Sequence, residues 1–218
     1  MFTGIIEAQG AVKSVEKKGV SGRIHISAGI DLTVSGIGGS IAINGVCLTI
    51  TTFDDKGFVA DISDETLRST TLGVLVYGSP VNIERALTLT KPLGGHLVTG
   101  HVDGIGRLTG KRRSGAGAEF EFSAPEALLR QIVRKGSVAV DGLSLTVAAL
   151  TDNGFTVAVI PHTLATTTFG NLKIGAEVNI ETDIIGKYVD RYLSGRAQGG
   201  ITEGFLAEHG FLPFLKEG

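Results

Sequence analysis

The sequence predicts an all-β protein built from two homologous six-stranded Greek-key closed barrels in tandem, followed by a C-terminal helix. The first observation is an internal repeat: at a shift of 97, residues 39–84 align without a gap with residues 136–181, and 20 of the 46 pairs are identical. This period is too long for a solenoid unit and matches a small domain. The second observation is a series of short alternating segments separated by turn residues. Such segments favour closed barrels, because closure leaves no exposed strand edges.

We place the first barrel at residues 1–96, the second at 97–185, and the C-terminal helix and tail at 186–218. In each barrel two strands flank a tight turn, Asn44-Gly45 in the first copy and Asp141-Gly142 in the second. These pairs supply the positive φ angles of a β-hairpin. Alternating segments at 57–62 and 154–160 follow, and 81–84 and 178–181 supply the last strand of each copy.

Helices are expected at two places. Residues 125–133 begin with a proline that suits a first helical turn and continue with apolar residues at helical spacing. After the second barrel, Ile184, Tyr188, Tyr192 and Leu193 can share one face of a helix. That face must be buried somewhere, and a partner subunit would cover it as well as the barrels would.

Composition excludes several classes of function. The formal charge of −2 gives no electrostatic reason to expect nucleic acid as a partner. No apolar run approaches membrane-spanning length and no secretory leader is recognisable, so we expect a cytoplasmic protein without a membrane partner. The single Cys47 excludes an intrachain disulfide and a zinc site built on several thiolates.

Four segments together resemble the riboflavin synthase family: Met1–Glu7, the equivalent blocks 44–49 and 141–146, and Gly94–Val102. The resemblance runs from residue 1 to about 196. It implies that each barrel binds one 6,7-dimethyl-8-ribityllumazine, two per site. Transfer of a four-carbon unit between them would give riboflavin and 5-amino-6-ribitylamino-pyrimidinedione, with neither a metal nor a separate organic cofactor. It also implies a homotrimer in which the first barrel of one chain faces the second barrel of its neighbour, so that two substrates meet already oriented.

The same resemblance implies two substrate pockets. The first would be lined by Gly4, Ile5, Ile6, Cys47, Leu48, Thr49, Asp61, Ile62, Ser63, Asp64, Glu65 and Thr66. The second would be lined by Gly100, His101, Val102, Ser144, Leu145, Thr146, Ile160, Pro161, His162, Thr163, Leu164 and Ala165, with Lys135 reaching across from a neighbouring chain. Threonines at equivalent places in both repeats (Thr49, Thr66, Thr146 and Thr163) offer hydroxyls to a ribityl chain. Alternatively, they are present because threonine favours strands.

Differences between the copies indicate the catalytic candidates. Ile5 corresponds to His101, Cys47 to Ser144, and Glu65 to His162. His101 is the candidate proton shuttle, since imidazole titrates near neutrality, with a structural hydrogen bond as the alternative. Cys47 either assists addition to an electrophilic ring carbon or is an inert core residue.

Ser40 is a weaker candidate donor, and it has a twin in Ser137. The whole chain has two alternative functions besides the enzyme. A non-catalytic lumazine- or flavin-binding protein of the same fold is the alternative to the enzyme. An oligonucleotide-binding barrel pair is disfavoured, because aromatic residues make up only 6% of the chain.

Overall fold

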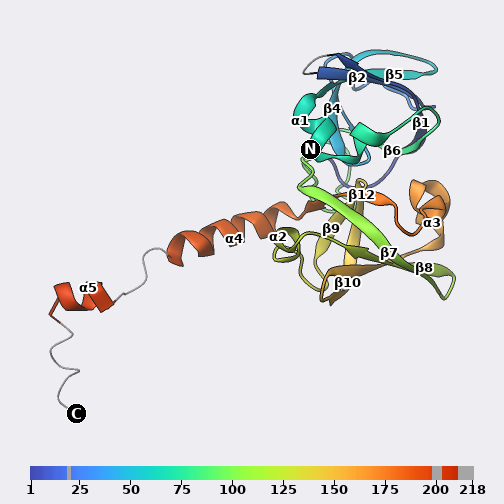
Figure 1. Cartoon of the computed structure of the whole chain (residues 1–218). Helices are drawn as coiled ribbons and strands as arrows, with labels where there is room; N and C mark the ends of the chain where they lie inside the picture. The colour runs from blue at the N-terminus through green and yellow to red at the C-terminus, as the bar shows by residue number, and fades with distance from the viewer. Residues whose placement is uncertain (19–20, 198–202, 211–218) are drawn as a thin grey trace. The chain divides into compact units, whose positions relative to one another are not determined.

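The computed structural model describes residues 1–18, 21–197 and 203–210. The first barrel contains six antiparallel strands: β1 (Ala8–Lys18), β2 (Ser21–Ser27), β3 (Ser40–Ile43), β4 (Val46–Asp54), β5 (Gly57–Ser63) and β6 (Pro80–Arg85). They pair in the order β1-β2-β5-β4-β3-β6, and pairing of β6 with β1 closes the ring (Figure 1).

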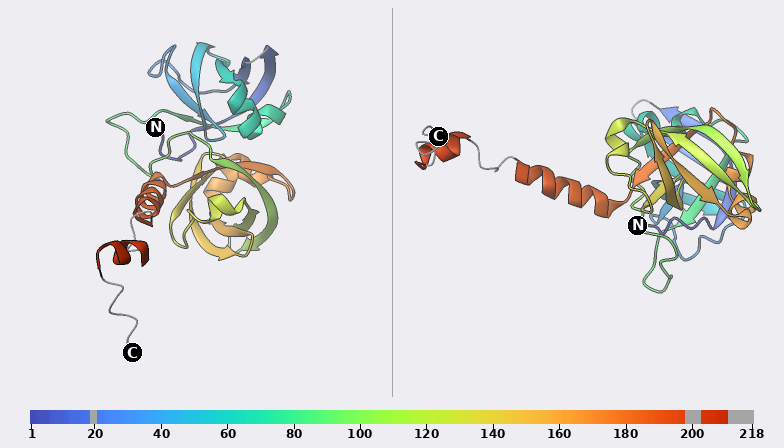
Figure 2. Two further views of the ribbon diagram at one scale, coloured as in Figure 1. Left: turned by 60° about the vertical axis from the view of Figure 1, so that its left-hand side comes forward. Right: turned by 90° about the horizontal axis from the view of Figure 1, so that it is seen from below.

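The second barrel repeats this arrangement. Its strands are β7 (Gly104–Ser114), β8 (Gly117–Ser123), β9 (Ser137–Val140), β10 (Leu143–Thr151), β11 (Gly154–Val159) and β12 (Glu177–Thr182). They pair in the order β7-β8-β11-β10-β9-β12, and β12 pairs again with β7. The left view of Figure 2 shows this ring of strands. The predicted pair of six-stranded closed barrels is therefore confirmed.

Each barrel encloses its own hydrophobic core, because alternate residues of every strand point inward. The first core is mostly aliphatic, with Ile24, Ile41 and Ile50 among its fully buried members. The second contains four phenylalanines whose rings contact one another in the barrel interior: Phe120, Phe122, Phe155 and Phe169.

The two predicted hairpin turns bring the barrels together. Asn44 and Gly45 have φ angles of 45° and 77°, and Asp141 and Gly142 have 44° and 81°, as a tight turn with two positive φ angles requires. The two turns pack against each other. A Cβ atom on Gly45 would lie 2.7 Å from the backbone nitrogen of Gly142, so only glycine permits this approach.

Hydrogen bonds between the barrels follow the same two-fold pattern. The Asn82 amide donates to the Asp141 carbonyl at 3.1 Å, and the Asn179 amide donates to the Asn44 carbonyl at 2.9 Å. The side-chain oxygens of these two asparagines accept bonds from backbone N–H groups of the opposite barrel. Both asparagines are buried, so each satisfies polar groups that water cannot reach.

Short helices connect the strands. α1 (Asp64–Ser69) and η1 (Thr71–Val74) follow β5, and α3 (Pro161–Thr166) and η2 (Thr168–Asn171) follow β11. The helix expected over 125–133 is shorter than predicted: α2 spans only Glu126–Leu129. The N–H groups of Gln131 and Ile132 bond three residues back, so the segment tightens into turns before β9.

The chain divides into a compact unit, Met1–Ile184, that holds both barrels, and a second unit, Ile185–Gly218. The expected C-terminal helix is present as α4 (Ile184–Ala197), and α5 (Glu203–Glu208) follows it. Tyr188, Tyr192 and Leu193 of α4 are exposed. Residues 198–202 and 211–218 of the expected tail lie outside the described residues. No helix within the described ranges is long and apolar enough to cross a membrane.

Candidate functional site

A row of small polar side chains crosses the outward face of the first barrel. In the strand register Ser40 of β3 lies opposite Thr49 of β4, and Thr49 lies opposite Asp61 of β5. Cys47 is two residues before Thr49 and therefore shares its face. Thr49 and Asp61 are exposed, and Cys47 is half-buried. This face can offer hydroxyl, thiol and carboxylate groups to a ligand.

The end of this face is shaped by α1. Ser63 caps the helix: its Oγ accepts from Thr66 N at 3.0 Å and lies 2.8 Å from Thr66 Oγ1. Asp64 and Glu65 occupy the first helical turn, where carboxylates are favoured by the helix dipole. Ser63 and Thr66 thus form one hydroxyl pair beside the exposed row.

The second barrel presents an equivalent face. Ser137 of β9 pairs with Thr146 of β10, and Ser144 lies on the same side of β10. Ile160 takes the place of the Ser63 cap and is 63% exposed. The remaining predicted residues, Pro161, His162, Thr163, Leu164 and Ala165, all belong to α3. Lys135 is exposed and precedes β9 with a φ of 69°.

Three predicted pocket residues point away from these faces. Leu48 and Ile62 lie in the first hydrophobic core, and Leu145 lies in the second. Alternation along β4, β5 and β10 places them inside the barrels, so only their backbone groups can meet a ligand.

The opening segments of the two repeats are exchanged between the barrels. Ser144 N of the second barrel donates to Gly4 O at 2.8 Å, and Cys47 N of the first barrel donates to Gly100 O at 2.9 Å. A Cβ on Gly4 would lie 2.6 Å from Ser144 Cβ, and a Cβ on Gly100 would lie 2.5 Å from Cys47 Cβ. Both glycines also have positive φ angles, so each position requires glycine for its backbone conformation as well as for the close contact.

This exchange changes how the predicted residues are grouped. Gly4, Ile5 and Ile6 were predicted to line the first pocket, but within one chain Gly4 approaches Ser144 and Ile6 packs against the second core. Gly100, His101 and Val102 were predicted to line the second pocket, but within one chain Gly100 approaches Cys47 and Val102 packs against the first core. His101 therefore follows a glycine that contacts Cys47, while Ile5 follows a glycine that contacts Ser144.

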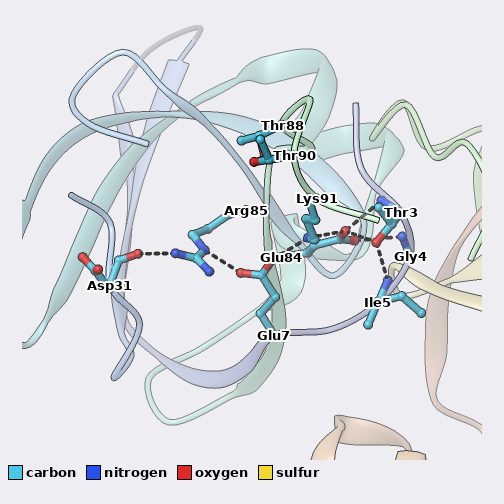
Figure 3. A network of polar contacts seen from close by, with 10 residues as sticks. All are labelled: Thr3, Gly4, Ile5, Glu7, Asp31, Glu84, Arg85, Thr88, Thr90 and Lys91. Carbon is cyan, nitrogen blue, oxygen red and sulfur yellow. Dashed lines mark hydrogen bonds and ion pairs between the residues drawn. The ribbon is translucent and has the colours of Figure 1, made fainter. Parts of the chain in front are cut away.

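A buried glutamate holds each opening segment in place. Glu84 Oε1 accepts from Thr3 N at 2.7 Å and from Thr3 Oγ1 at 2.6 Å, and its Oε2 accepts from Gly4 N at 2.9 Å (Figure 3). Glu181 makes the same three bonds to Thr99 and Gly100, at 2.6, 2.7 and 2.9 Å. Hydrogen bonds to a carboxylate are stronger than neutral ones, so these segments are firmly positioned.

The first barrel adds cations to this arrangement (Figure 3). Lys91 bonds to Glu7 and, at 3.3 Å, to Glu84, and Arg85 Nε bonds to Glu7 at 2.6 Å. Burial raises the pKa of Glu7, but the hydrogen bonds from Lys91 and Arg85 outweigh it and leave the pKa below its ordinary value. This cluster borders a cavity of about 430 Å³ that Ser40 also lines.

No group of three or more His, Cys, Asp and Glu side chains is arranged to hold a metal ion within the described part of the chain. Sequence reasoning missed the glutamates Glu84 and Glu181, which shape the faces. It identified His96 only as a structural residue of the linker, whereas His96 Nδ1 lies 2.7 Å from Ser144 Oγ. The signal for the glutamates was present, since each ends an identical Val-Asn-Ile-Glu block.

The duplicated arrangement agrees with known proteins. A family model described as the lumazine binding domain matches residues 3–86 and again residues 99–183. The riboflavin synthase of Bacillus subtilis (strain 168) is 41% identical over 215 residues, which cover 97% of this chain and 100% of that protein. The chain belongs to the riboflavin synthase family. Members of this family are transferases, so the chain is an enzyme of that class.

Further comparisons support membership of the riboflavin synthase family. The enzyme of Mycobacterium tuberculosis (strain ATCC 25618 / H37Rv) is 42% identical over 197 residues, covering 88% of this chain and 98% of that protein. Among solved structures, LumP complexed with 6,7-dimethyl-8-(1'-D-ribityl) lumazine superposes with a TM-score of 0.73 at 23% identity. That superposition covers 84% of this chain and 99% of LumP, and it supports the fold.

Proposed function

We propose that the chain catalyses the dismutation of 6,7-dimethyl-8-ribityllumazine. One molecule gives a four-carbon unit to a second, identical molecule, and the products are riboflavin and 5-amino-6-ribitylamino-pyrimidinedione. Atoms balance without water, oxidant or reductant. The observation that carries the proposal is the pair of equivalent polar faces, each with a serine and a threonine on adjacent paired strands, in a chain similar over its full length to riboflavin synthases.

The differences between the faces support distinct roles for the two bound substrates. Transfer requires loss of a proton from a methyl group of one lumazine and nucleophilic attack on the ring of the other. His101 and Cys47 belong to the same neighbourhood, because Gly100 contacts Cys47. We propose His101 as the group that moves the proton and Cys47 as the group nearest the electrophilic ring, with Ser40 on the neighbouring strand as a donor.

Sharing of the site between copies of the chain is part of the proposal. Although the two barrels of one chain pack together through their hairpin turns, Thr49, Asp61, Thr146 and His162 remain exposed. A reaction between two reactive molecules benefits from facing pockets that exclude water. We propose that the first barrel of one chain faces the second barrel of another in a homotrimer, with Lys135 at that interface and the apolar side chains of α4 contributing to assembly.

The test of the activity is direct. Purified protein is incubated with the lumazine, and both products are quantified by chromatography alongside a protein-free sample that measures the spontaneous reaction. We expect one riboflavin for every two lumazines consumed. Tight binding of lumazine without conversion would instead identify a carrier protein. The likeness to LumP raises that alternative, but the relatives that are about 40% identical are riboflavin synthases.

Sharing of the site is tested with a matched pair of variants at equivalent exposed positions. Thr49→Trp blocks the first face and Thr146→Trp blocks the second, so each variant alone should be inactive. When equal amounts are unfolded, mixed and refolded, about a quarter of shared sites combine two intact faces under random cyclic assembly. Recovery of about a quarter of wild-type activity supports the proposal. No recovery in trimers shown by native mass spectrometry to be mixed contradicts it.

A further inference from the structure

A groove between the two barrels is lined by none of the residues predicted to bind substrate. Its volume is about 510 Å³, within the range of about 300–1,000 Å³ that is typical of small-molecule sites. The segment between α1 and β6 lines one side, and the equivalent segment between α3 and β12 lines the other. The turn residues Asn44 and Asp141 also line it. Equivalent residues of the two repeats thus meet in one groove.

Two equivalent threonines of this groove leave their hydroxyls without a partner. Thr71 and Thr168 are 5% and 8% exposed, and no described residue bonds to either Oγ1. The preceding threonines differ, because Thr70 Oγ1 and Thr167 Oγ1 each donate to the carbonyl four residues earlier, at 2.6 and 2.7 Å. Buried polar groups without a partner are uncommon in native proteins. Two of them at equivalent positions in one groove point to a ligand.

The backbone of both threonines is fixed, whereas their hydroxyls are not. Thr71 N donates to Asn179 Oδ1 at 2.8 Å, and Thr168 N donates to Asn82 Oδ1 at 2.9 Å. Because no bond within the described chain holds either Oγ1, rotation about χ1 can turn each hydroxyl toward a ligand. Both threonines lie in a block, Thr-Thr-Leu-Gly in the first repeat and Thr-Thr-Phe-Gly in the second, that the repeats share. The proposed activity uses neither block.

The lining of the groove indicates the chemical class of the ligand. Val74 and Leu75 line it from the first barrel and Leu172 from the second, which suits a ligand with an apolar body. Arg107 pairs with Glu177 at 2.6 Å, so this cation is already neutralised and an anion is not favoured. Two equivalent hydroxyls can donate to two carbonyl oxygens. A heteroaromatic ring with an imide edge has this combination, because its two carbonyls flank one N–H with approximate two-fold symmetry.

We propose that this groove binds the ring system of a flavin, with the hydroxyls of Thr71 and Thr168 donating to its two imide carbonyls. The choice of a flavin rests on the proposed function, since riboflavin is the flavin that the proposed reaction releases. The site is separate from both substrate faces, because it shares no residue with them. A ligand held by both repeats stabilises the folded pair of barrels by mass action.

Lumiflavin, which has the flavin ring but no ribityl chain, is the probe for this site. Full-length protein that carries both Thr49→Trp and Thr146→Trp, so that the two substrate faces are blocked, is titrated by fluorescence quenching. We expect one lumiflavin per chain. Thr71→Val and Thr168→Val keep the shape of the side chain and should each weaken binding about 5- to 10-fold, as expected for loss of one hydrogen bond.

Urea unfolding separates ligand binding from a structural role of the two hydroxyls. Without lumiflavin, Thr71→Val and Thr168→Val should not lower the urea midpoint, because each replaces an unpaired buried hydroxyl with a methyl group of the same shape. A lowered midpoint would show that the hydroxyls have structural partners and would overturn the proposal. Thr51→Val is the matched control: its Oγ1 donates to Val59 O at 3.2 Å outside the groove, so this variant should leave lumiflavin binding unchanged.

Two further outcomes would contradict the proposal. The first is lumiflavin binding that neither valine variant weakens. The second is the absence of binding, which is also tested in wild-type protein labelled with ¹³C at threonine methyl groups, where the signals of Thr71 and Thr168 should shift when lumiflavin is added. Riboflavin formation is measured separately. A wild-type protein that forms no riboflavin but binds lumiflavin through these threonines would contradict the proposed activity alone.

Discussion

Asp141 gives the stability of this protein a predictable dependence on pH. It occupies the position of Asn44 in the other repeat, and both side chains accept a backbone N–H bond at 2.8 Å, from Asn179 and Asn82 respectively. Burial raises the pKa of Asp141 to about 7, although the bond from Asn179 favours the charged form. The unfolded chain releases this proton near pH 3.8, whereas the folded protein holds it until about pH 7.

The sign and size of the effect follow from linkage. Because the folded state binds the extra proton, Asp141 lowers stability as the pH rises from about 4 to about 7, and its contribution is constant above that range. A difference of about 3 pKa units corresponds to about 4 kcal/mol. Asp141→Asn keeps the acceptor oxygen, tolerates the positive φ and cannot lose a proton. The variant should therefore match the wild type near pH 4 and be more stable by up to about 4 kcal/mol at pH 8.

Urea unfolding of the variant and the wild type between pH 4.5 and 8.5 measures this difference. The gain should grow by about 1.4 kcal/mol per pH unit and level off above about pH 7. Asp152→Asn, at an exposed position, is the matched control and should show no such trend. Asn44→Asp should add a second penalty of the same sign. A difference between Asp141→Asn and the wild type that does not vary with pH would refute the reasoning.

Three further results are expected. Gly100→Ala should cost about 2–4 kcal/mol of unfolding free energy, because its φ is 83° and its Cβ would meet Cys47; an unaltered urea midpoint would contradict this. His101→Ala should lower kcat and kcat/KM together, whereas a raised KM alone would reassign His101 to substrate binding. A fragment of residues 1–103 should be more stable than residues 1–97 by about 1–2 kcal/mol in thermal unfolding, because it retains Val102 against the first core; equal stability would argue against the exchanged segments.

The fold was predictable because its signals are local. The turns at Asn44-Gly45 and Asp141-Gly142 need positive φ angles that these residue pairs supply, and the flanking alternation fixes which side chains point inward. The predicted length of the helix over 125–133 was wrong. The spacing of apolar residues shows only that Leu128 and Ile132 are buried on the same side, and a continuous helix is not the only way to achieve this. A single turn of helix followed by tighter turns buries both and still lets the chain reach β9.

The composition of each face was less predictable, because it depends on contacts between the barrels. Aligning the repeats assigns each opening segment to its own barrel, since nothing in the local sequence shows which barrel a segment crosses to. The bonds from Ser144 N to Gly4 and from Cys47 N to Gly100 exist only once the two hairpin turns have packed together. The glycines themselves were visible in the sequence, but the partners that require them were not.

The exchange has a chemical consequence for a protein with two similar faces. If each opening segment stayed with its own barrel, the residues that differ between the repeats would be divided, with His101 on one face and Cys47 on the other. Because the segments cross, Gly100, which precedes His101, bonds to Cys47 at the first face, and Gly4, which precedes Ile5, bonds to Ser144 at the second. The residue that carries an imidazole therefore follows directly after the backbone contact to the residue that carries a thiol, and these are the two groups that we propose for proton transfer and addition. At the second face the crossing segment brings an aliphatic residue instead, and the hydroxyl of Ser144 lies 2.7 Å from His96 Nδ1.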